Sequence, residues 1–412
     1  MNARVIPMRV DVAVIGRGAV GVATALGFAR AGRSVAVVGP ERAVILPEPG
    51  ADNRVFALSS HSRRLLETLG VWQAIPPERL AAVTDMRVQP EGGRIDRSLD
   101  FSAYEARADA LAWIVENSAL NHALAQALGF SSIRRVDAAL STLTCGPRDP
   151  FARLQFDDGR SLEARLVVGA DGARSSVREL ARIGSRWRDY PQRALVANFD
   201  GEWPHRGIAW QWFGEHGILA LLPLARGPQG EHRYSIVWSA PLALADQLQM
   251  LPPDALAARV EAVSAGVAGR LRLISRVESH PLRLGRVESL IAPRLALVGD
   301  AAHGIHPLAG QGMNLGFGDV VDLLAALATA DDPGARLILR RYERARAEPV
   351  LSMQALTDGL QRLFDPQGLE GWQPFDRPIR ALRDLGWDLI ARSDWLRNRL
   401  IEQAAGRPTL GG

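Results

Sequence analysis

Hydrophobic and polar residues follow two different periods along the chain, and this mixture predicts an α/β protein. Residues 10–15 form a short β-branched apolar run, and residues 34–38 form a second, as expected for buried parallel strands. Between them, residues 22–31 place Val, Ala, Leu and Phe at helical spacing, and Gly32 ends the predicted helix. The N-terminal segment is therefore predicted to form a βαβ unit.

Alternation of apolar and polar residues dominates a later part of the chain. It predicts an antiparallel sheet whose strands cover residues 194–199, 207–213, 218–222 and 234–239. Between residues 378 and 405, leucine and isoleucine recur every three or four positions with arginines between them, which predicts amphipathic helices. Packing against the rest of the protein and docking on a membrane surface or a partner both remain open for these helices.

A glycine motif of the form GxGxxG follows the first predicted strand. Gly16 allows a tight turn, Gly18 lets the backbone approach a pyrophosphate, and Gly21 permits close packing of the following helix. In its βαβ context the motif predicts a dinucleotide site. An acidic residue is expected at the end of the second strand to hold the adenosine ribose. Gly39 occupies that place, and Glu41 is the candidate that reaches back to the ribose.

Two more turns with polar residues follow later strands. Residues 166–178 predict a strand that runs through Asp171-Gly172 into a helix, and residues 295–303 predict a strand that ends in Gly299-Asp300. Residues 307–314 then open a long apolar helix. Each motif alone is compatible with a structural turn. Together and in this order, they resemble the motifs of the single-component FAD-dependent aromatic monooxygenases, which have the para-hydroxybenzoate hydroxylase fold.

Stretches outside these motifs resemble the hydroxylases of ubiquinone biosynthesis over nearly the whole chain, at residues 54–72, 114–117, 217–224, 306–312, 342–346 and 382–386. The resemblance implies an α/β fold with a discontinuous Rossmann-like domain that binds FAD and NAD(P), an inserted antiparallel sheet domain and C-terminal helices. The expected FAD-binding domain comprises residues 1–79, 105–190 and 285–345. The expected substrate domain comprises residues 80–104 and 191–284, and the C-terminal helical region comprises residues 346–412.

The resemblance also implies which residues hold FAD. Asp300 is expected to bind a ribityl hydroxyl, and Asp171 to organise the turn near the pyrophosphate. The N-terminus of the helix that begins near residue 312 is expected to face the flavin, because a positive helix end stabilises the negative charge of the reduced ring. Beyond the motif glycines and Glu41, the expected cofactor contacts are Arg54, Asn117, Asp171, Asp300, Gly310, Gly312, Met313 and Asn314.

The implied reaction is hydroxylation of an aromatic ring. NAD(P)H as likely donor reduces the flavin, O₂ adds at C4a, and the C4a-hydroperoxyflavin transfers a hydroxyl group to an electron-rich ring. The carbonyl of Pro307 is expected to polarise the substrate hydroxyl and is the catalytic candidate, whereas His303 and His306 are interpreted as structural groups. An apolar pocket for a lipid tail is one interpretation of four sheet residues, and packing of the sheet against its neighbour is the other. These residues are Trp210, Trp212, Leu222 and Pro223.

A polyprenyl phenol intermediate of ubiquinone biosynthesis is the favoured substrate. The alternatives are a monooxygenase of the same fold that acts on a soluble phenol or secondary metabolite, an FAD-dependent prenyl-lipid reductase, and a non-catalytic scaffold of a biosynthetic complex. Gly39 motivates the scaffold, because a missing ribose carboxylate weakens FAD binding. The ring position and the oligomeric state are not readable from the residues.

Composition removes several other classes of protein. All 49 basic residues are arginine, and without lysine neither a P-loop, a Schiff-base enzyme nor a flavin halogenase can operate. The single cysteine, Cys145, excludes a disulfide and a cysteine-based metal site. Scattered arginines and a net charge of +4 give no support for nucleic-acid binding. No apolar run spans a membrane and no signal peptide is visible, so a cytoplasmic enzyme is expected. Peripheral contact with the inner face of the membrane or with a biosynthetic complex remains open.

Overall fold

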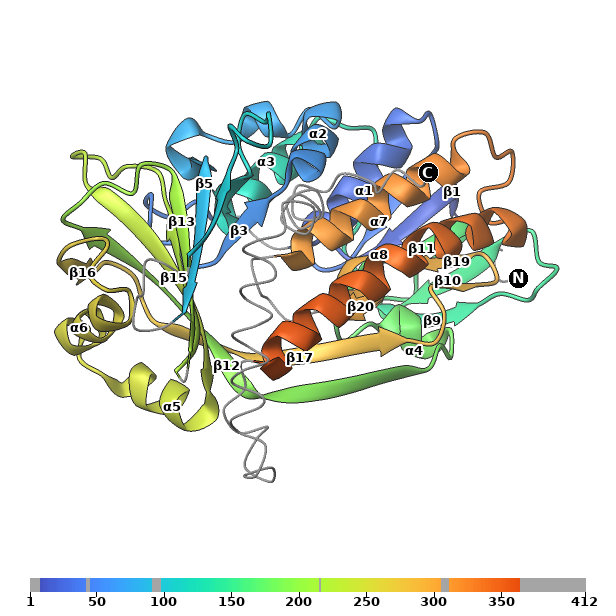
Figure 1. Ribbon diagram of the computed structural model, residues 1–412. Helices are drawn as coiled ribbons and strands as arrows, with labels where there is room; N and C mark the ends of the chain where they lie inside the picture. The colour runs from blue at the N-terminus through green and yellow to red at the C-terminus, as the bar shows by residue number, and fades with distance from the viewer. Residues whose placement is uncertain (1–7, 42–44, 91–97, 215, 305–310, 364–412) are drawn as a thin grey trace, which may run out of the picture.

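The computed structural model describes residues 8–41, 45–90, 98–214, 216–304 and 311–363. Three sheets and their covering helices form two adjoining halves (Figure 1). The predicted α/β fold class is confirmed, and helices of both halves pack on the sheets as the hydrophobic pattern indicates. Of the predicted C-terminal helical region, α8 (Arg336–Leu363) is described, and residues 364–412 lie outside the described residues.

An eight-stranded sheet forms the nucleotide-binding half, with the path β18-β19-β11-β1-β2-β8 and with β10 and β9 added beside β11. The pairs β1–β11, β1–β2, β2–β8 and β11–β19 are parallel. Their register sets Ile15 beside Gly169 and Val38, and Gly169 beside Leu297, so the carboxyl ends of four strands meet at one edge. The strands are β1 (Met8–Ile15), β2 (Val35–Val38), β8 (Arg134–Val136), β9 (Leu140–Thr144), β10 (Ala152–Phe156), β11 (Ser161–Gly169), β18 (Ile291–Ala292) and β19 (Leu295–Leu297).

Helix α1 (Ala19–Arg30) is apolar on almost every side because it lies between the sheet and other helices. Val22, Leu26 and Phe28 are buried in the same core as residues of β1 and of the surrounding helices. Burial of each such side chain contributes about 1.5–3 kcal/mol to folding. The other described α-helices of this half are α2 (Ser60–Thr68), α3 (Asn117–Gly129), α4 (Ser176–Leu180), α7 (Gln311–Leu327) and α8, which contributes Leu339 and Tyr342 to the same core.

A nine-stranded sheet forms the second half, with the path β20-β17-β12-β15-β14-β13-β5-β6 and with β16 beside β12. Its pairs are antiparallel except β13–β5, which is parallel. Helices α5 (Leu242–Met250) and α6 (Pro253–Val263) cover one face through a core that contains Trp212, Tyr234 and Trp238. The strands are β5 (Asp85–Pro90), β6 (Leu99–Ser102), β12 (Ser185–Gly201), β13 (Ile208–Gly214), β14 (Gly217–Pro223), β15 (His232–Pro241), β16 (Leu271–Leu273), β17 (Glu278–Val287) and β20 (His303–Gly304).

A three-stranded sheet of β3 (Val55–Leu58), β7 (Ala112–Glu116) and β4 (Leu80–Val83) lies between the two halves in Figure 1. Strand β4 begins the first predicted insertion, residues 80–104, yet it pairs with β7. The first strand of that insertion to join the nine-stranded sheet is β5. The division into domains at these boundaries stays a prediction.

The loop from residue 45 to residue 54, which joins β2 to β3, is bonded to both halves. The backbone N–H of Gly50 donates to the buried carboxylate of Glu116 at 2.8 Å, and Asp52 Oδ2 accepts from the Ser118 N–H at 2.6 Å. From the nine-stranded sheet, Asn198 Nδ2 donates to the carbonyl oxygens of Gly50 and Asp52, both at 2.8 Å. The loop is therefore held from two sides.

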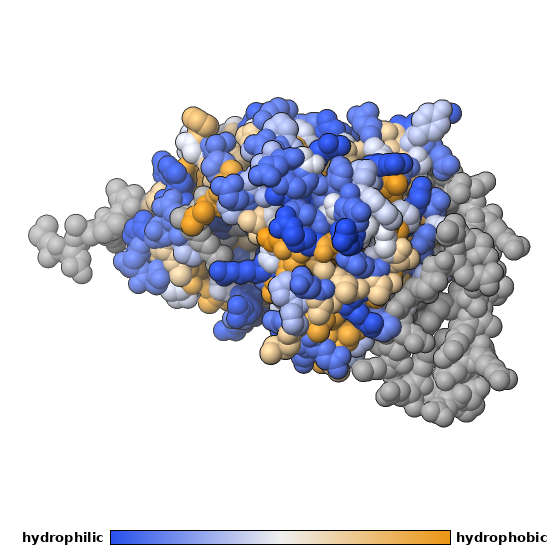
Figure 2. All heavy atoms as spheres, turned by 90° about the vertical axis from the view of Figure 1, so that its left-hand side faces the viewer, coloured by the Kyte–Doolittle hydropathy of each residue, from blue (hydrophilic) through white to orange (hydrophobic). Residues whose placement is uncertain are grey.

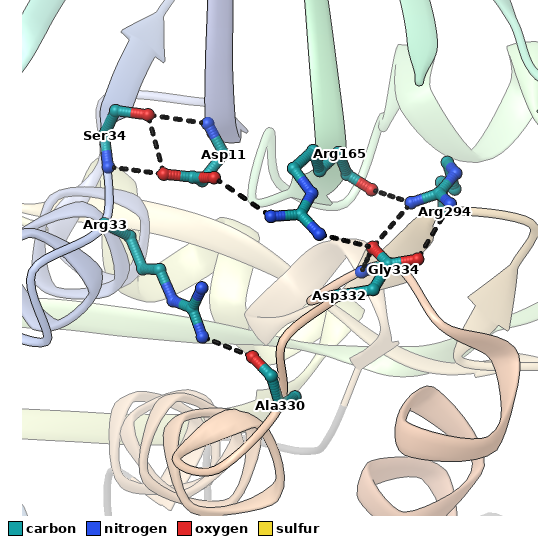
Figure 3. A network of polar contacts seen from close by, with 8 residues as sticks. All are labelled: Asp11, Arg33, Ser34, Arg165, Arg294, Ala330, Asp332 and Gly334. Atoms are coloured by element: carbon teal, nitrogen blue, oxygen red, sulfur yellow. Dashed lines mark hydrogen bonds and ion pairs between the residues drawn. The ribbon is translucent and has the colours of Figure 1, made fainter. Parts of the chain in front are cut away.

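A polar network ties the sheet of the nucleotide-binding half to the loop between α7 and α8, toward the amino ends of the parallel strands (Figure 3). Asp332 accepts two hydrogen bonds of 2.8 Å from the guanidinium of Arg294, which precedes β19. Arg165 of β11 lies between two carboxylates, 3.6 Å from Asp11 Oδ1 and 3.8 Å from Asp332 Oδ1. These contacts hold the α7–α8 loop against this end of the sheet.

Replacement of Asp332 by Asn should lower the melting temperature at pH 7 by roughly 1–2 °C, because a partly exposed ion pair contributes little. Hydrogen bonds from Arg294 hold the pKa of the Asp332 carboxyl below its ordinary value of 3.8. A lowered folded-state pKa stabilises the protein above the unfolded-state pKa, and this stability disappears as the pH falls through the folded-state pKa. The difference in melting temperature between wild type and variant should become smaller below about pH 4. Calorimetry across this range, with the exposed neighbour Asp331→Asn as control, checks it; a gap that widens in acid contradicts it.

Candidate active site

The three predicted motif turns lie side by side at the carboxyl edge of the eight-stranded sheet. A Cβ atom on Gly16 would lie 2.2 Å from the carbonyl oxygen of Ala170, next to Asp171. A Cβ atom on Gly299 would lie 3.3 Å from the side chain of Val20 in the first turn of α1. The parallel strands thus bring three motifs that are far apart in the sequence to one edge of the sheet.

The glycines of the first motif differ in what requires them. Gly16 has a φ of +116° and touches Ala170, and a Cβ atom on Gly21 would lie 2.2 Å from the Gly16 carbonyl oxygen. Gly18, the N-cap of α1, has φ −75° and ψ 175°, and no heavy atom lies within 4 Å of where its Cβ would be. Contacts within the described protein explain Gly16 and Gly21. Open space at a helix N-terminus beside Gly18 fits the predicted pyrophosphate.

Asp171 has one oxygen bound within the protein and one without a partner. Its Oδ2 accepts from the Ser176 hydroxyl at 3.0 Å and from the Val177 N–H at 3.1 Å. Its Oδ1 is buried and has no hydrogen-bond donor among the described residues. Because a buried acceptor without a donor is costly, this oxygen fits a contact with a ligand or an ordered water molecule.

Asp300 lies in a short 3₁₀ turn, Gly299–Ala301, with its side chain exposed to solvent. Desolvation by the surrounding protein nevertheless raises the pKa of this carboxyl, while the positive charges of His303 and Arg54 lower it. Asp300 and the exposed Arg54 therefore belong to one electrostatic environment. The carbonyl of Arg54 accepts from the Asn117 N–H at 2.9 Å, so Asn117 lies beside it. The amide oxygen of Asn117 accepts from Asn121 at 2.8 Å.

A buried aspartate on α7, which the sequence analysis missed, supports the Gly-Asp turn from behind. Asp319 Oδ2 accepts from the Gly299 N–H at 2.7 Å and lies 2.7 Å from His303 Nε2. Its Oδ1 accepts from Arg346 Nε at 2.7 Å. Burial raises the pKa of Asp319, but His303 and Arg346 outweigh burial and leave the pKa lowered. These contacts are the kind that the structural interpretation of His303 expects.

Arg178, also missed, joins the second and third motif turns. It is 5% exposed, and its guanidinium donates to the carbonyl oxygens of Ala301 at 3.0 Å and Ala173 at 2.8 Å. A planar guanidinium can reach two carbonyls at once, which a lysine ammonium does less well. The only signal in the sequence was an arginine in the short helix that follows the Asp171-Gly172 turn.

The predicted helix-end residues have separate positions. Asn314 uses its side chain within the protein, since Oδ1 accepts from the Ser59 N–H at 2.9 Å and the Ser62 hydroxyl at 2.7 Å. Met313 packs against the core, and a Cβ on Gly312 would meet nothing within 4 Å. Gly310 and the catalytic candidate Pro307 lie outside the described residues, as does His306.

At the end of β2, Gly39 has a φ of +145°, and Glu41 is held beside it. The Glu41 N–H donates to Asp137 Oδ1 at 2.9 Å, and its carboxylate lies 3.4 Å from a guanidinium nitrogen of Arg17. Glu41 is therefore at the expected end of the sheet, although its side chain is 64% exposed.

The four predicted pocket residues do not line one surface. Trp210 and Trp212 stack with ring centroids 5.9 Å apart and belong to the core beneath α5 and α6. Leu222 packs on the opposite face of the sheet, against residues of β3, β4 and β7. Pro223 lies opposite Tyr234 in the β14–β15 ladder. For Trp212 and Leu222 the contacts are those of the packing interpretation.

A family model described as an FAD-binding domain matches residues 9–356 of the chain. Ubiquinone hydroxylase UbiL of Rhodospirillum rubrum is 36% identical over 97% of this chain and 90% of the relative. The 3-demethoxyubiquinol 3-hydroxylase of Escherichia coli is 32% identical over 96% of this chain and 98% of the relative. The human mitochondrial ubiquinone biosynthesis monooxygenase COQ6 is 32% identical over 86% of this chain and 85% of the relative.

Solved structures share the fold at low sequence identity. The p-nitrophenol 4-monooxygenase PnpA of Pseudomonas putida superposes with a TM-score of 0.74 at 19% identity, over 97% of this chain and 100% of that chain. The anhydrotetracycline hydroxylase OxyS of Streptomyces rimosus superposes with a TM-score of 0.66 at 21% identity, over 98% of this chain and 78% of that chain. At these identities the likeness concerns the arrangement of the chain.

Substitution of Gly18 by Val should abolish most flavin retention while the protein still folds. The backbone angles at Gly18 are open to any residue, and the new branches would occupy only the space next to the α1 N-terminus. We expect FAD affinity to fall by more than roughly tenfold. Flavin absorbance of the purified variants measures it. Gly129→Val, which also enters open space, is the control; equal flavin content in both variants would contradict the assignment.

Removal of the Asp319 carboxylate should destabilise the protein strongly, because Asp319→Ala takes from the buried Arg346 its fully buried partner and leaves the Gly299 N–H without its acceptor. Loss of one partner of a buried pair costs about 3–5 kcal/mol. Asp322→Ala removes a second, partly exposed partner of the same arginine and should cost much less. Urea unfolding measures the stability of the two variants, and similar midpoints would contradict the stabilising role of the buried Asp319.

Proposed function

Since the chain belongs to the FAD-binding-domain family of flavoprotein monooxygenases, we propose that it hydroxylates the aromatic ring of a polyprenyl phenol intermediate in ubiquinone biosynthesis. The observation that carries the proposal is the 36% identity to a ubiquinone hydroxylase over nearly the full length of both chains. The convergence of the three motif turns supports it, because it assembles the cofactor-binding surface that this chemistry needs.

The residues present fit FAD. Bound FAD, reduced by NAD(P)H, supplies the activation of O₂ for transfer of one oxygen atom to the ring. The α1 N-terminus beside Gly18 would bind the pyrophosphate. The unpartnered Oδ1 of Asp171 would accept a hydrogen bond in the same region, and Asp300 would accept one from a ribityl hydroxyl. Arg54, close enough to Asp300 to influence its pKa, would lie against the cofactor.

Helix α7 would contribute its positive end to the flavin. The helix runs from Gln311 to Leu327, and the side chain of Asn314 fixes its first turn to β3 and α2. A helix N-terminus stabilises negative charge that develops next to it. In this arrangement the amides at Gly312 and Met313 would stabilise the negative charge of the reduced flavin, and the Asn314 side chain would position them. The polarising role of the Pro307 carbonyl remains a hypothesis outside the described residues.

The aromatic ring of the substrate would meet the face of the nine-stranded sheet that is turned away from α5 and α6. The helix-covered face is filled by Trp212 and Trp238. Strand alternation places Gln211 and Ala220, which lie opposite each other in the β13–β14 ladder, on the other face. The Gln211 amide, 8% exposed, would supply a polar contact there among apolar neighbours.

None of the described helices is long and apolar enough to cross a membrane. Figure 2, which looks onto the end formed by the nine-stranded sheet and its helices, shows apolar patches among hydrophilic residues. Trp203, Leu242 and Met250 of this half are exposed by 53%, 47% and 84%. We propose that the protein acts in the cytoplasm, in transient contact with the inner membrane face that would hold a lipid-tailed substrate. Cosedimentation with anionic lipid vesicles checks this contact, and a protein that stays wholly in the supernatant argues against it.

The decisive experiment follows oxygen into the product. Purified protein reconstituted with FAD is incubated with NAD(P)H, ¹⁸O₂ and a phenol that carries a short prenyl chain, and a tail-free phenol is run in parallel. We expect a product with one ¹⁸O atom and faster turnover of the prenylated ring. A reduced product without ¹⁸O would identify a reductase, and a preference for the tail-free phenol would identify a soluble-substrate enzyme. Failure to bind FAD at all would favour the scaffold.

A further inference from the structure

The end of β2 lacks the acidic side chain that nucleotide-binding folds use to hold an adenosine ribose. Gly39 occupies this position with a φ of +145°, a backbone angle that residues other than glycine rarely adopt. A Cβ atom at this position would also lie 3.5 Å from the side chain of Arg17. Backbone strain therefore disfavours an aspartate or glutamate at position 39.

Arg17, the second residue of the glycine motif, lies across Gly39. Its side chain is 13% exposed. One terminal nitrogen lies 3.3 Å from the Gly39 carbonyl oxygen, and the other lies 3.4 Å from Glu41 Oε1. Both contacts are longer than an ordinary N–H···O hydrogen bond. A guanidinium has five N–H donors, and the other three have no partner among the described residues. Arg17 is thus a partly buried arginine with donors that remain available to a ligand beside it.

Glu41 is the charged partner of this guanidinium among the residues that the structure describes. Its main-chain N–H donates to Asp137 at the end of β8, and its carboxylate lies 3.4 Å from Arg17. A carboxylate is thereby brought to the end of β2, although it comes two positions later in the sequence than the expected one.

We propose that Arg17 and Glu41 together bind the adenosine ribose of FAD. Arg17 donates to a ribose oxygen, and Glu41 accepts from a ribose hydroxyl. The glycine-rich loop and the end of the second strand flank the adenosine part of a dinucleotide in a βαβ site, and the pair lies between these two segments. The inference rests on the FAD site of the proposed function and is independent of the aromatic substrate.

The test compares FAD with its analogue that has 2′,3′-dideoxyadenosine in place of adenosine. Each is titrated into the apoprotein, and quenching of flavin fluorescence gives the dissociation constant. Wild type should bind FAD roughly tenfold more tightly than the analogue, the effect of one or two hydrogen bonds to charged groups. Arg17→Ala and Glu41→Gln should each lose most of this preference and keep the affinity for the analogue. Arg30→Ala, at the other end of α1, removes an exposed arginine and should keep the preference.

The outcomes separate this inference from the proposed function. Equal weakening of both ligands in Arg17→Ala would make Arg17 a structural residue and overturn the inference, as would a full preference in both variants. A wild-type protein without any preference overturns the ribose contact and leaves the hydroxylase proposal intact. A wild-type protein that binds neither ligand overturns both. Glu41 is 64% exposed, so its substitution decides the matter even if Arg17→Ala fails to fold.

Discussion

The parallel pairing of β1 with β11 and of β11 with β19 is the constraint on which the rest of the molecule depends. A parallel ladder fixes where each strand ends relative to its neighbour. Ile15, Gly169 and Leu297 are therefore level with one another, and the turns that follow them share one edge. The strands themselves are buried and apolar, so the polar surface takes its geometry from the core. Ligands of open α/β sheets bind at this edge.

Arginine performs the connecting work around that edge in a chain without lysine. Arg178 joins two turns through their carbonyl oxygens, and Arg346 joins α8 to Asp319. Arg17 extends the same principle to the end of β2. Each uses the flat, many-donor shape of the guanidinium, which a lysine ammonium does not reproduce. Dependence on arginine here reflects geometry as much as charge.

Local patterns predicted the fold where strand, glycine turn and helix follow one another within a few residues, as around Gly16 and Asp171. Contacts between distant segments escaped prediction. Alternation placed Trp210 and Trp212 on one face of a strand, but the identity of that face depends on helices α5 and α6, which return to cover it. Asp319 is one of two acids in a mostly apolar helix, and its partners come from the Gly-Asp turn and from α8. The departure at Gly39 was visible in the sequence, whereas its cause, a positive φ, was not.

The loop before β3 has a consequence for how the protein folds. Its backbone groups are satisfied by Glu116 on one side and by Asn198 on the other. If either half came apart alone, the loop would lose partners for buried polar groups, and each such loss is costly. A partly folded species with one intact half is therefore disfavoured. The two halves are expected to melt as a single cooperative unit, despite the size of the chain and its separate cores.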